Sequence, residues 1–356
     1  MRVVVAMSGG VDSSVAALLL KEQGHEVVGV TMMLVDCAAG PKARVPSCCG
    51  RQAVRDAQKV AVKLGIPHYT IDFRQQMESE VVADFCREYA LGRTPNPCIR
   101  CNERLKFRLL LGRAIELGAE KLATGHYARI QADEGDTWRL LRGKDPAKDQ
   151  SYFLYRVTQE QLAHLVMPLG ELTKREVREL AHRSKLPVAE KRESQEVCFV
   201  AGEDWAGFLK QRSPELFRPG KVVDTQGRIL GEHKGVAHYT VGQRKGLGIA
   251  FGERRYIVGL RPETNEVVIG IYEEALSKVA ELEQVHWISG REPSGSIEVA
   301  AKIRSQHEGG FAVVEPAGVR ATMRFREPQF AVTPGQAAVF YQGDMVLGGG
   351  VIRVSG

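Results

Sequence analysis

Long apolar runs are missing from this chain of 356 residues. No window approaches the roughly 18 consecutive apolar residues of a membrane-spanning helix. The N-terminus also lacks the positively charged stretch, apolar segment and cleavage site of a secretion signal. We therefore expect a cytoplasmic protein with no membrane partner. Internal repeats and low-complexity segments are absent as well, so the sequence is typical of a globular protein.

Apolar residues make up 44% of the chain and charged residues 26%, the proportions of a soluble globular protein. The length is large for one domain and predicts two or three. The seven cysteines are an odd number in a chain without a secretion signal. This favours reduced thiols, redox chemistry or metal binding over a framework of disulfide bonds.

A glycine-containing loop near the N-terminus is the most informative motif. The residues Ser8-Gly9-Gly10-Val11-Asp12-Ser13 follow the β-branched run 3–5 and precede a helical pattern that Gly24 ends. Glycines let a ligand approach the backbone closely, and the free N–H groups of a helix N-terminus attract anions. The loop has no lysine, which excludes the GxxxxGK[ST] phosphate loop. Its residues suit pyrophosphate, with Asp12 near an accompanying magnesium ion.

Strand and helix patterns alternate over the first 200 residues. Apolar runs predict strands at 3–5, 26–33, 68–72 and 121–124, and helices are expected at 49–64, 103–117, 158–165 and 173–184. Thr173 and Glu176 have the spacing of a capping box at the start of the last helix. This alternation predicts an α/β fold with a doubly wound parallel sheet, which binds its ligand at the carboxyl ends of the strands.

The pattern changes after about residue 201. A short helix is expected at 203–210, followed by short β-type runs that glycines separate. From about residue 273, β-type runs alternate with proline and glycine, which is typical of a small β-barrel or sandwich. We therefore expect three domains: a Rossmann-like α/β domain at 1–201, a small central domain at 202–272 and a C-terminal β-barrel at 273–356.

Basic residues are concentrated in the segment 87–113. Only Glu88 and Glu103 offset the basic side chains there, which are Arg87, Arg93, Arg100, Arg104, Lys106, Arg108 and Arg113. Such a cluster is either the electrostatic footprint of a polyanion or an ordinary solvated helix face. The charge pattern alone leaves both interpretations open.

A CxxC motif, Cys98-Ile99-Arg100-Cys101, lies inside this basic segment. Nearby positive charge ionises a thiol, so Cys101 is a candidate thiolate. Three interpretations compete: a zinc site completed by Cys48 and Cys49, a redox pair or iron–sulfur site, and a structural pair. No second CxxC or CxxH follows at the spacing of a zinc ribbon.

The other cysteines are weaker candidates when each is taken alone. Cys198 lies between Val197 and Phe199, which is typical of a small buried apolar residue. The same structural interpretation applies to Cys37, Cys48, Cys49 and Cys86.

The glycine loop resembles the PP-loop of the ATP pyrophosphatase families, which cleave ATP between its α and β phosphates. Together with the segments 94–102 and 193–200, it is similar to the bacterial tRNA-specific 2-thiouridylase family. Further motifs resemble the same family: ATGHY (123–127), KDQSYFL (148–154), HYTVGQRKGLGI (238–249), PGQAAVFY (334–341) and LGGGVI (347–352). The resemblance therefore covers essentially the whole chain.

This resemblance implies ATP-dependent 2-thiolation of the wobble uridine in tRNAs for Lys, Glu and Gln. ATP with Mg²⁺ adenylates the C2 oxygen, and sulfur from a cysteine persulfide then replaces AMP. A cysteine desulfurase or a relay protein is the implied source of the persulfide. The chemistry is coherent because adenylation turns a poor leaving group into AMP, and because water must be kept from the adenylate.

The resemblance also implies the roles of individual residues. The ATP site comprises Ala6, Met7, Ser8, Gly9, Gly10, Val11, Asp12, Ser13, Met32 and Gly125. Cys198 is the implied persulfide carrier, and Cys101 is the second active cysteine, able to form a disulfide with it. Asp12 completes the catalytic set. The implied tRNA contacts are Asn96, Pro97, Cys98, His126, Lys148, Asp149, Gln150, Arg304, Ser305 and Gln336.

One position departs from the family pattern. Many relatives have aspartate where this chain has Cys98, so Cys98, Cys101 and Cys198 form a set of three thiols. Such a set can hold three irons of a [4Fe–4S] cluster and leave the fourth open for sulfide, which is the alternative to a persulfide relay. Two other functions are alternatives: an RNA-binding module with a degenerate nucleotide site, and a PP-loop ligase for a small metabolite. The intact loop opposes the first, and the basic cluster opposes the second.

Overall fold

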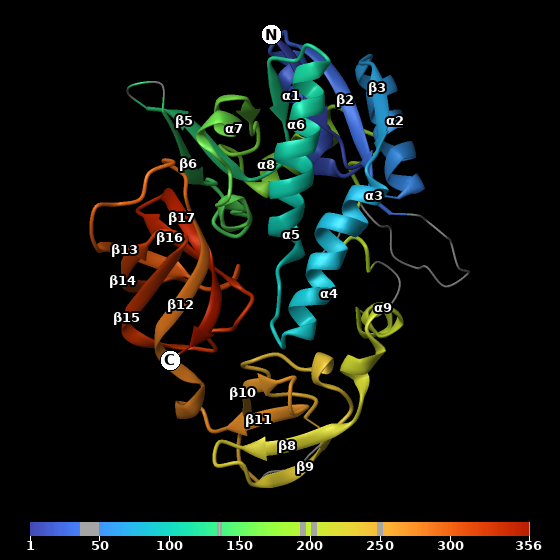
Figure 1. Ribbon diagram of the computed structural model, residues 1–356. Coiled ribbons are helices and arrows are strands. Elements are labelled where there is room, and N and C mark those ends of the chain that lie inside the picture. The colour runs from blue at the N-terminus through green and yellow to red at the C-terminus, as the bar shows by residue number, and fades with distance from the viewer. Residues whose placement is uncertain are drawn as a thin grey trace.

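The computed structural model describes residues 1–35, 50–133, 135, 137–192, 197–200, 205–247 and 252–355 (Figure 1). Its N-terminal part contains a parallel five-stranded sheet in the order β3-β2-β1-β4-β7. The strands are β1 (Arg2–Ala6), β2 (Glu26–Met33), β3 (His68–Asp72), β4 (Lys121–Ala123) and β7 (Leu165–Val166). The predicted parallel sheet is confirmed.

Helices cover both faces of this sheet because β1 is apolar on both sides. Val3 and Val5 belong to a core shared with α1 (Val11–Glu22), α2 (Arg51–Leu64) and α8 (Lys174–Arg183). Val4 belongs to a second core on the opposite face. Alternate residues of an extended strand point to opposite faces, so a continuous run of valines is what a doubly wound sheet needs.

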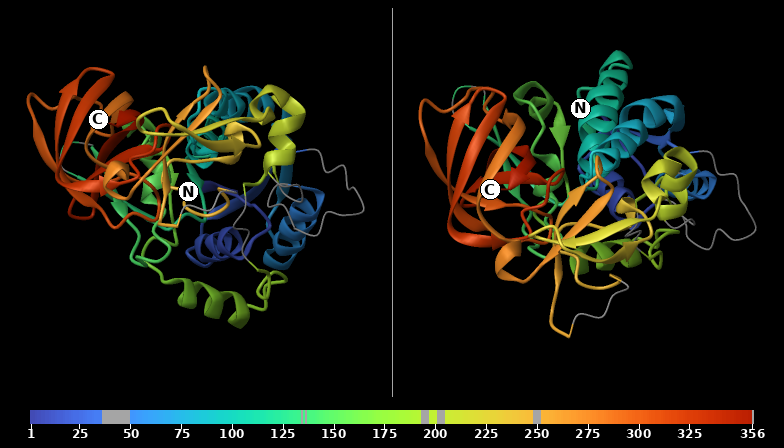
Figure 2. Two further views of the ribbon diagram at one scale, coloured as in Figure 1. Left: turned by 90° about the horizontal axis from the view of Figure 1, so that it is seen from below. Right: turned by 60° about the horizontal axis from the view of Figure 1, so that its bottom comes forward.

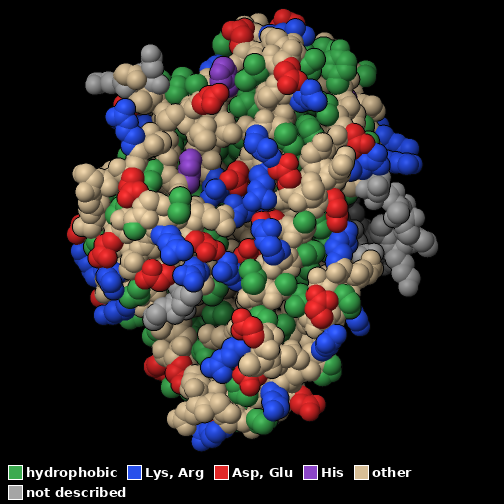
Figure 3. Space-filling model, viewed as in Figure 1, with side chains coloured by type: hydrophobic (Ala, Val, Ile, Leu, Met, Phe, Trp, Pro, Cys, Tyr) green, Lys and Arg blue, Asp and Glu red, His purple; other side chains and the backbone are tan. Residues whose placement is uncertain are grey.

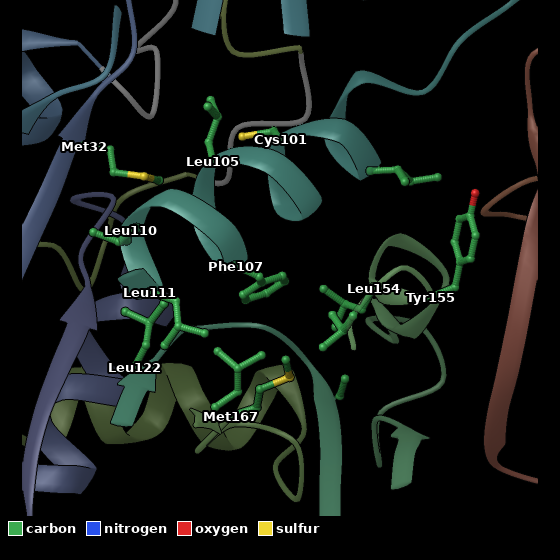
Figure 4. Close-up of a cluster of buried hydrophobic side chains, with 14 of the residues drawn as sticks. Met32, Cys101, Leu105, Phe107, Leu110, Leu111, Leu122, Leu154, Tyr155 and Met167 are labelled. Carbon is green, nitrogen blue, oxygen red and sulfur yellow. The ribbon is translucent and has the colours of Figure 1, made fainter. Parts of the chain in front are cut away.

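Two long helical segments build the second core. The first runs through α3 (Arg74–Met77), η1 (Glu78–Val82) and α4 (Ala83–Ala90). The second runs through α5 (Pro97–Arg100), η2 (Cys101–Leu110) and α6 (Leu111–Glu116), with π-type hydrogen bonds in η2. Leu105, Phe107 and Leu110 of this segment share this core with Leu122 and Leu154 (Figure 4). The helix expected from residue 103 thus begins at Pro97 and includes the CxxC motif.

A hairpin connects the N-terminal part with the C-terminal barrel. Its strands are β5 (Ala128–Ala132) and β6 (Trp138–Arg142), and β6 pairs with β17 through Leu141 and Met345. Gln159, the first residue of α7 (Gln159–Ala163), donates from Nε2 to the carbonyls of Trp138 and Ile288. The barrel is therefore attached by both strand pairing and side-chain hydrogen bonds. The sequence patterns did not predict this hairpin.

Six antiparallel strands form the predicted C-terminal barrel. They are β12 (Leu276–Trp287), β13 (Ile297–Lys302), β14 (Gly310–Ala317), β15 (Arg320–Phe330), β16 (Ala337–Gln342) and β17 (Met345–Ser355). β12 pairs with both β15 and β17, which closes the ring. Val299, Met323 and Phe340 lie in its core.

A small mixed sheet lies between the two larger parts in the sequence. Its order is β10-β11-β8-β9, made of β8 (Gly220–Asp224), β9 (Ile229–His233), β10 (Tyr256–Arg261) and β11 (Glu266–Gly270). Helix α9 (Trp205–Arg212) precedes it. Figures 1 and 2 place the barrel at one side of the molecule and α2 at the other. Among the described residues, no helix is both long and apolar enough to cross a membrane.

Candidate active site

A cavity of about 420 Å³ opens beside the ends of β1, β2 and β4, where a doubly wound sheet binds its ligand. It brings together segments that are far apart in the sequence: the glycine loop (residues 8–13), the CxxC helix, the 123–127 motif and the segment of Cys198. Of the residues expected at the site, it is lined by Ala6, Met7, Ser8, Gly10, Val11, Asp12, Ser13, Met32, Pro97, Cys98, Cys101, Gly125, His126, Gln150 and Cys198.

The glycine loop has the strand–turn–helix geometry that its sequence indicates. Gly9 has φ +66°, and a Cβ there would overlap the backbone of Ala53. Gly10 is extended at the N-cap of α1 and has no side chain to cap it, which leaves N–H groups at this helix end for an anion. Gly125 passes close by, because its Cβ would lie 2.7 Å from the amide nitrogen of Ser13. Glycine is therefore required at position 9, against the backbone of Ala53, and at position 125, against that of Ser13.

Asp12 points its carboxylate at two groups that the sequence did not identify. Lys174 Nζ lies 2.7 and 2.9 Å from the two carboxylate oxygens. The hydroxyl of Tyr127 donates to Asp12 Oδ1 at 2.8 Å. Lys174 follows Asp12 by 162 residues and begins α8, behind the confirmed capping box of Thr173 and Glu176. The capping box was a signal for the helix, but no sequence signal showed which way Lys174 faces.

A second lysine, Lys191, supports the shape of the glycine loop. Its Nζ donates to the carbonyl of Gly9 at 2.9 Å and lies 2.6 Å from a carboxylate oxygen of Asp56 on α2. Gly9 lies in the glycine loop and Asp56 on α2, so Lys191 links the loop to this helix. Sequence reasoning missed this lysine as well.

Three thiols line the cavity. Cys98 is exposed, Cys101 is buried and Cys198 is half-buried. In Figure 4, Cys101 lies beside Leu105 at the edge of the second core. Within the described ranges, no group of three or more His, Cys, Asp or Glu side chains is arranged to hold a metal ion. The three cysteines thus line one cavity.

The remaining cysteines do not line this cavity, as far as the structure describes them. Cys86 lies on α4, where burial raises the pKa of its thiol, in agreement with the structural role expected from the sequence. Cys37, Cys48 and Cys49 lie outside the described residues. The zinc interpretation that uses Cys48 and Cys49 therefore falls outside the described part of the chain.

The positive charges beside Cys101 are paired within the protein. Asp84, only 3% exposed, lies within 3.5 Å of the guanidinium groups of Arg100 and Arg104 and also pairs with Arg87. Other members of the basic cluster are paired too: Arg93 with Glu88 and Glu283, Arg108 with Glu80, and Arg113 with Glu116. Figure 3 shows basic and acidic side chains intermixed on the face formed by α4–α6. This pairing favours the interpretation of an ordinary charged helix face.

His126 is a neutral group in the cavity wall. Burial, and to a smaller extent the charge of Lys106, lowers the pKa of His126 well below its ordinary value. Its Nδ1 lies 2.8 Å from the hydroxyl of Thr124, which fixes the ring. Gln150 Oε1 accepts from the backbone N–H of Tyr127 at 3.0 Å. The side chains of His126 and Gln150 are thus fixed by neighbouring groups.

The other expected tRNA contacts do not line the cavity. Asp149, with a side chain 4% exposed, accepts hydrogen bonds from the backbone N–H groups of Gly143 and Ser151. Arg304 donates to the carbonyl of Phe330, and Gln336 donates to that of Thr94. Lys148 lies near Asp149, Ser305 follows Arg304 on the barrel, and Asn96 is the N-cap residue of α5.

Comparisons with known proteins extend over the whole molecule. Family models match residues 1–202 (tRNA methyl transferase HUP domain), 206–271 (tRNA methyl transferase PRC-barrel domain) and 277–352 (aminomethyltransferase beta-barrel domain). A Geobacter metallireducens protein named tRNA-specific 2-thiouridylase MnmA is 51% identical over 99% of this chain and 96% of its own. Its namesake from Moorella thermoacetica is 50% identical over 98% of this chain and 99% of its own. The similarity thus includes both the cavity and the barrel.

Proposed function

Since this chain belongs to the family of tRNA-specific 2-thiouridylases, we propose that it performs ATP-dependent 2-thiolation of the wobble uridine in tRNAs for Lys, Glu and Gln. The observation that best supports this activity is the single cavity lined by the glycine loop, Cys101 and Cys198. Adenylation needs the loop, sulfur transfer needs a thiol, and both must reach the same uridine carbon.

The proposed reaction has two chemical steps. The C2 oxygen of the uridine attacks the α-phosphorus of ATP, and pyrophosphate leaves. The terminal sulfur of a persulfide on Cys198 then adds to C2, and AMP leaves with the former uridine oxygen. The thiolate of Cys101 attacks Sγ of Cys198, which breaks the sulfur–sulfur bond and leaves a Cys101–Cys198 disulfide. A thiol reductant returns both cysteines to the reduced form.

The residues of the cavity suit this chemistry. The open N-terminus of α1 can accept the phosphates. His126 is neutral, so its imidazole can hydrogen-bond the uridine without adding charge. Cys101 packs against apolar side chains of the second core, which limits access of water to an adenylate. We propose the remaining expected contacts, on the barrel and in the 148–150 segment, as the surface that holds the rest of the tRNA.

Magnesium fits this site through Asp12, a carboxylate at the cavity wall. When bound there with ATP, the ion would neutralise phosphate charge as pyrophosphate leaves. A [4Fe–4S] cluster fits less well, because the described cysteines are not grouped as metal ligands. We therefore derive no step through a cluster. Iron and sulfide content after oxygen-free purification decides between it and the persulfide relay.

Several further proposals follow from the assigned family. The sulfur donor is a persulfide-carrying protein, such as a cysteine desulfurase or a relay protein, and the substrate implies a cytoplasmic location. The catalytic domain is proposed to span residues 1–201, the central domain 202–272 and the barrel domain 273–356.

Thiolation of unmodified tRNA is the direct test. The purified protein, ATP, Mg²⁺ and a persulfide donor should put sulfur into tRNA and release AMP and pyrophosphate. Cys198→Ser should abolish sulfur transfer but leave AMP release, whereas Cys86→Ser, away from the cavity, should retain both. No sulfur in tRNA treated with the wild-type protein would contradict the proposed function.

A further inference from the structure

Lys174 is a cavity-lining cation outside all the motifs that define the site. The glycine loop itself contains no lysine, so any ammonium group that meets a bound polyphosphate must come from another segment. Of the two lysines beside the loop, Lys191 is bound to the Gly9 carbonyl and to Asp56. Lys174 instead contacts Asp12, a carboxylate that itself lines the cavity. The contacts of Lys191 therefore give it a role in the shape of the loop, whereas Lys174 lies beside a carboxylate of the cavity wall.

The backbone holds Lys174 in a fixed position. It is the first residue of α8, directly after the N-cap Thr173, whose hydroxyl accepts from the backbone N–H of Glu176. The backbone N–H of Lys174 donates to Asp145 Oδ2 at 2.9 Å. The side chain is 12% exposed, so little of it is left to solvent. The ammonium group is therefore positioned before any nucleotide arrives, which reduces the entropy cost of contacting one.

The charge of Asp12 explains why a cation is needed at this point. A carboxylate beside a polyphosphate is repulsive unless a positive charge lies between them. Lys174 supplies such a charge beside Asp12, and Tyr127 donates a hydrogen bond to the same carboxylate. With Asp12 as a ligand of a bound Mg²⁺, the phosphates would be the nearest anions for the ammonium group of Lys174. Lysine binds phosphate as a point charge, so a short movement is sufficient.

We propose that Lys174 binds the pyrophosphate portion of ATP, and that Asp12 holds it ready in the nucleotide-free protein. This inference rests on the proposed ATP-dependent function. It adds Lys174, a residue to which that proposal assigned no role. It predicts a selective effect: loss of the ammonium group weakens ligands that carry the β and γ phosphates, and it spares AMP.

Nucleotide binding without tRNA tests this assignment. Dissociation constants of ATP, pyrophosphate and AMP would be measured with Mg²⁺ for the wild type, Lys174→Met and Arg175→Met. Arg175 is the matched control, since it follows on the same helix, is 86% exposed and pairs with Glu179. Lys174→Met should weaken ATP and pyrophosphate by about tenfold or more and change AMP by less than about twofold. Arg175→Met should leave all three unchanged, and Lys174→Arg should restore part of the pyrophosphate affinity.

The outcomes separate the inference from the function beneath it. Unchanged ATP and pyrophosphate affinity in Lys174→Met would overturn the inference, and so would an equal loss for AMP, which indicates a structural role. A wild-type protein that binds no ATP would instead contradict the proposed function. Thermal unfolding identifies any variant that fails to fold, and Lys174→Gln is the second neutral replacement.

Discussion

The backbone carbonyl of Thr94 accepts a hydrogen bond from the side-chain amide of Gln336 at 2.7 Å, although 242 residues separate them. The backbone N–H of Thr94 donates to the carbonyl of Pro334. The hydroxyl of Thr94 donates to the hydroxyl of Thr240. Thr94 lies just before α5, which carries Cys98. One residue therefore joins the barrel and the central segment to the helix of the active-site cysteines.

Removal of the Gln336 amide should destabilise this junction. Gln336→Ala leaves the part-buried carbonyl of Thr94 without its side-chain donor, so we expect the free energy of unfolding to fall by about 1–3 kcal/mol. Chemical unfolding of the variant and of Gln342→Ala, an exposed position on β16, measures the effect. Equal stability of the two variants would show that the hydrogen bond contributes nothing.

Local sequence patterns predicted much of the fold. The strands expected at 26–33 and 68–72 match β2 and β3, and the capping box of α8 is present. The helix expected at 103–117 instead begins at Pro97, a start that the apolar pattern did not indicate. Proline is nevertheless well suited to the first turn of a helix, where its missing N–H costs no hydrogen bond.

The contacts between distant segments could not be predicted in this way. The β5–β6 hairpin is stabilised by pairing with β17, which comes some 200 residues later in the sequence. The contact of Lys174 with Asp12 depends on how α8 packs on α1, and no local pattern encodes that packing. The glycine loop could be identified because strand, turn and helix follow one another directly. Its cationic partners come from other elements and required the structure.

Asp84 is a buried acidic side chain that pairs with three arginines of the basic cluster. It pairs with Arg100, itself only 8% exposed, so Asp84→Asn leaves a buried guanidinium group with less compensation. We expect a loss of about 3 kcal/mol or more in the free energy of unfolding. Glu116→Gln is the matched control, because the pair of Glu116 with Arg113 is 62% exposed on both sides and should contribute little.

Two readouts distinguish this role from a direct role in chemistry. Unfolding experiments should show the loss for Asp84→Asn without any substrate present, and AMP release should fall only at temperatures where the variant begins to unfold. A variant as stable as Glu116→Gln would contradict the assignment of Asp84 as the central partner of the basic cluster.

Asp12→Asn should separate adenylation from tRNA binding. The amide is a weaker magnesium ligand than the carboxylate, so AMP formation at saturating tRNA should fall by about tenfold or more. Affinity for tRNA depends mainly on contacts with its phosphates and should stay nearly intact across a salt series. Asp344→Asn, on an exposed barrel turn, is the control. Loss of tRNA binding with normal AMP formation would reverse the roles assigned here.

His126 should make the protein less stable in mild acid. Burial lowers its pKa in the folded state, whereas the unfolded chain takes up a proton near pH 6.5. Below that pH the unfolded state binds a proton that the folded state does not, so stability decreases as the pH falls from 7 to 5. Burial also lowers the pKa of other histidines, including His68 and His286, so the wild type should respond at several sites.

The contribution of His126 can be isolated by its replacement with asparagine, which can still hydrogen-bond Thr124 and does not titrate in this range. The slope of unfolding free energy against pH, measured below pH 6.5 without tRNA, should decrease by up to about 1.4 kcal/mol per pH unit. The change should vanish above pH 7.5, where histidine is neutral in both states. Parallel pH profiles for the wild type and His126→Asn would show that the imidazole takes up its proton in the folded protein, and that the cavity wall is open to water at this position.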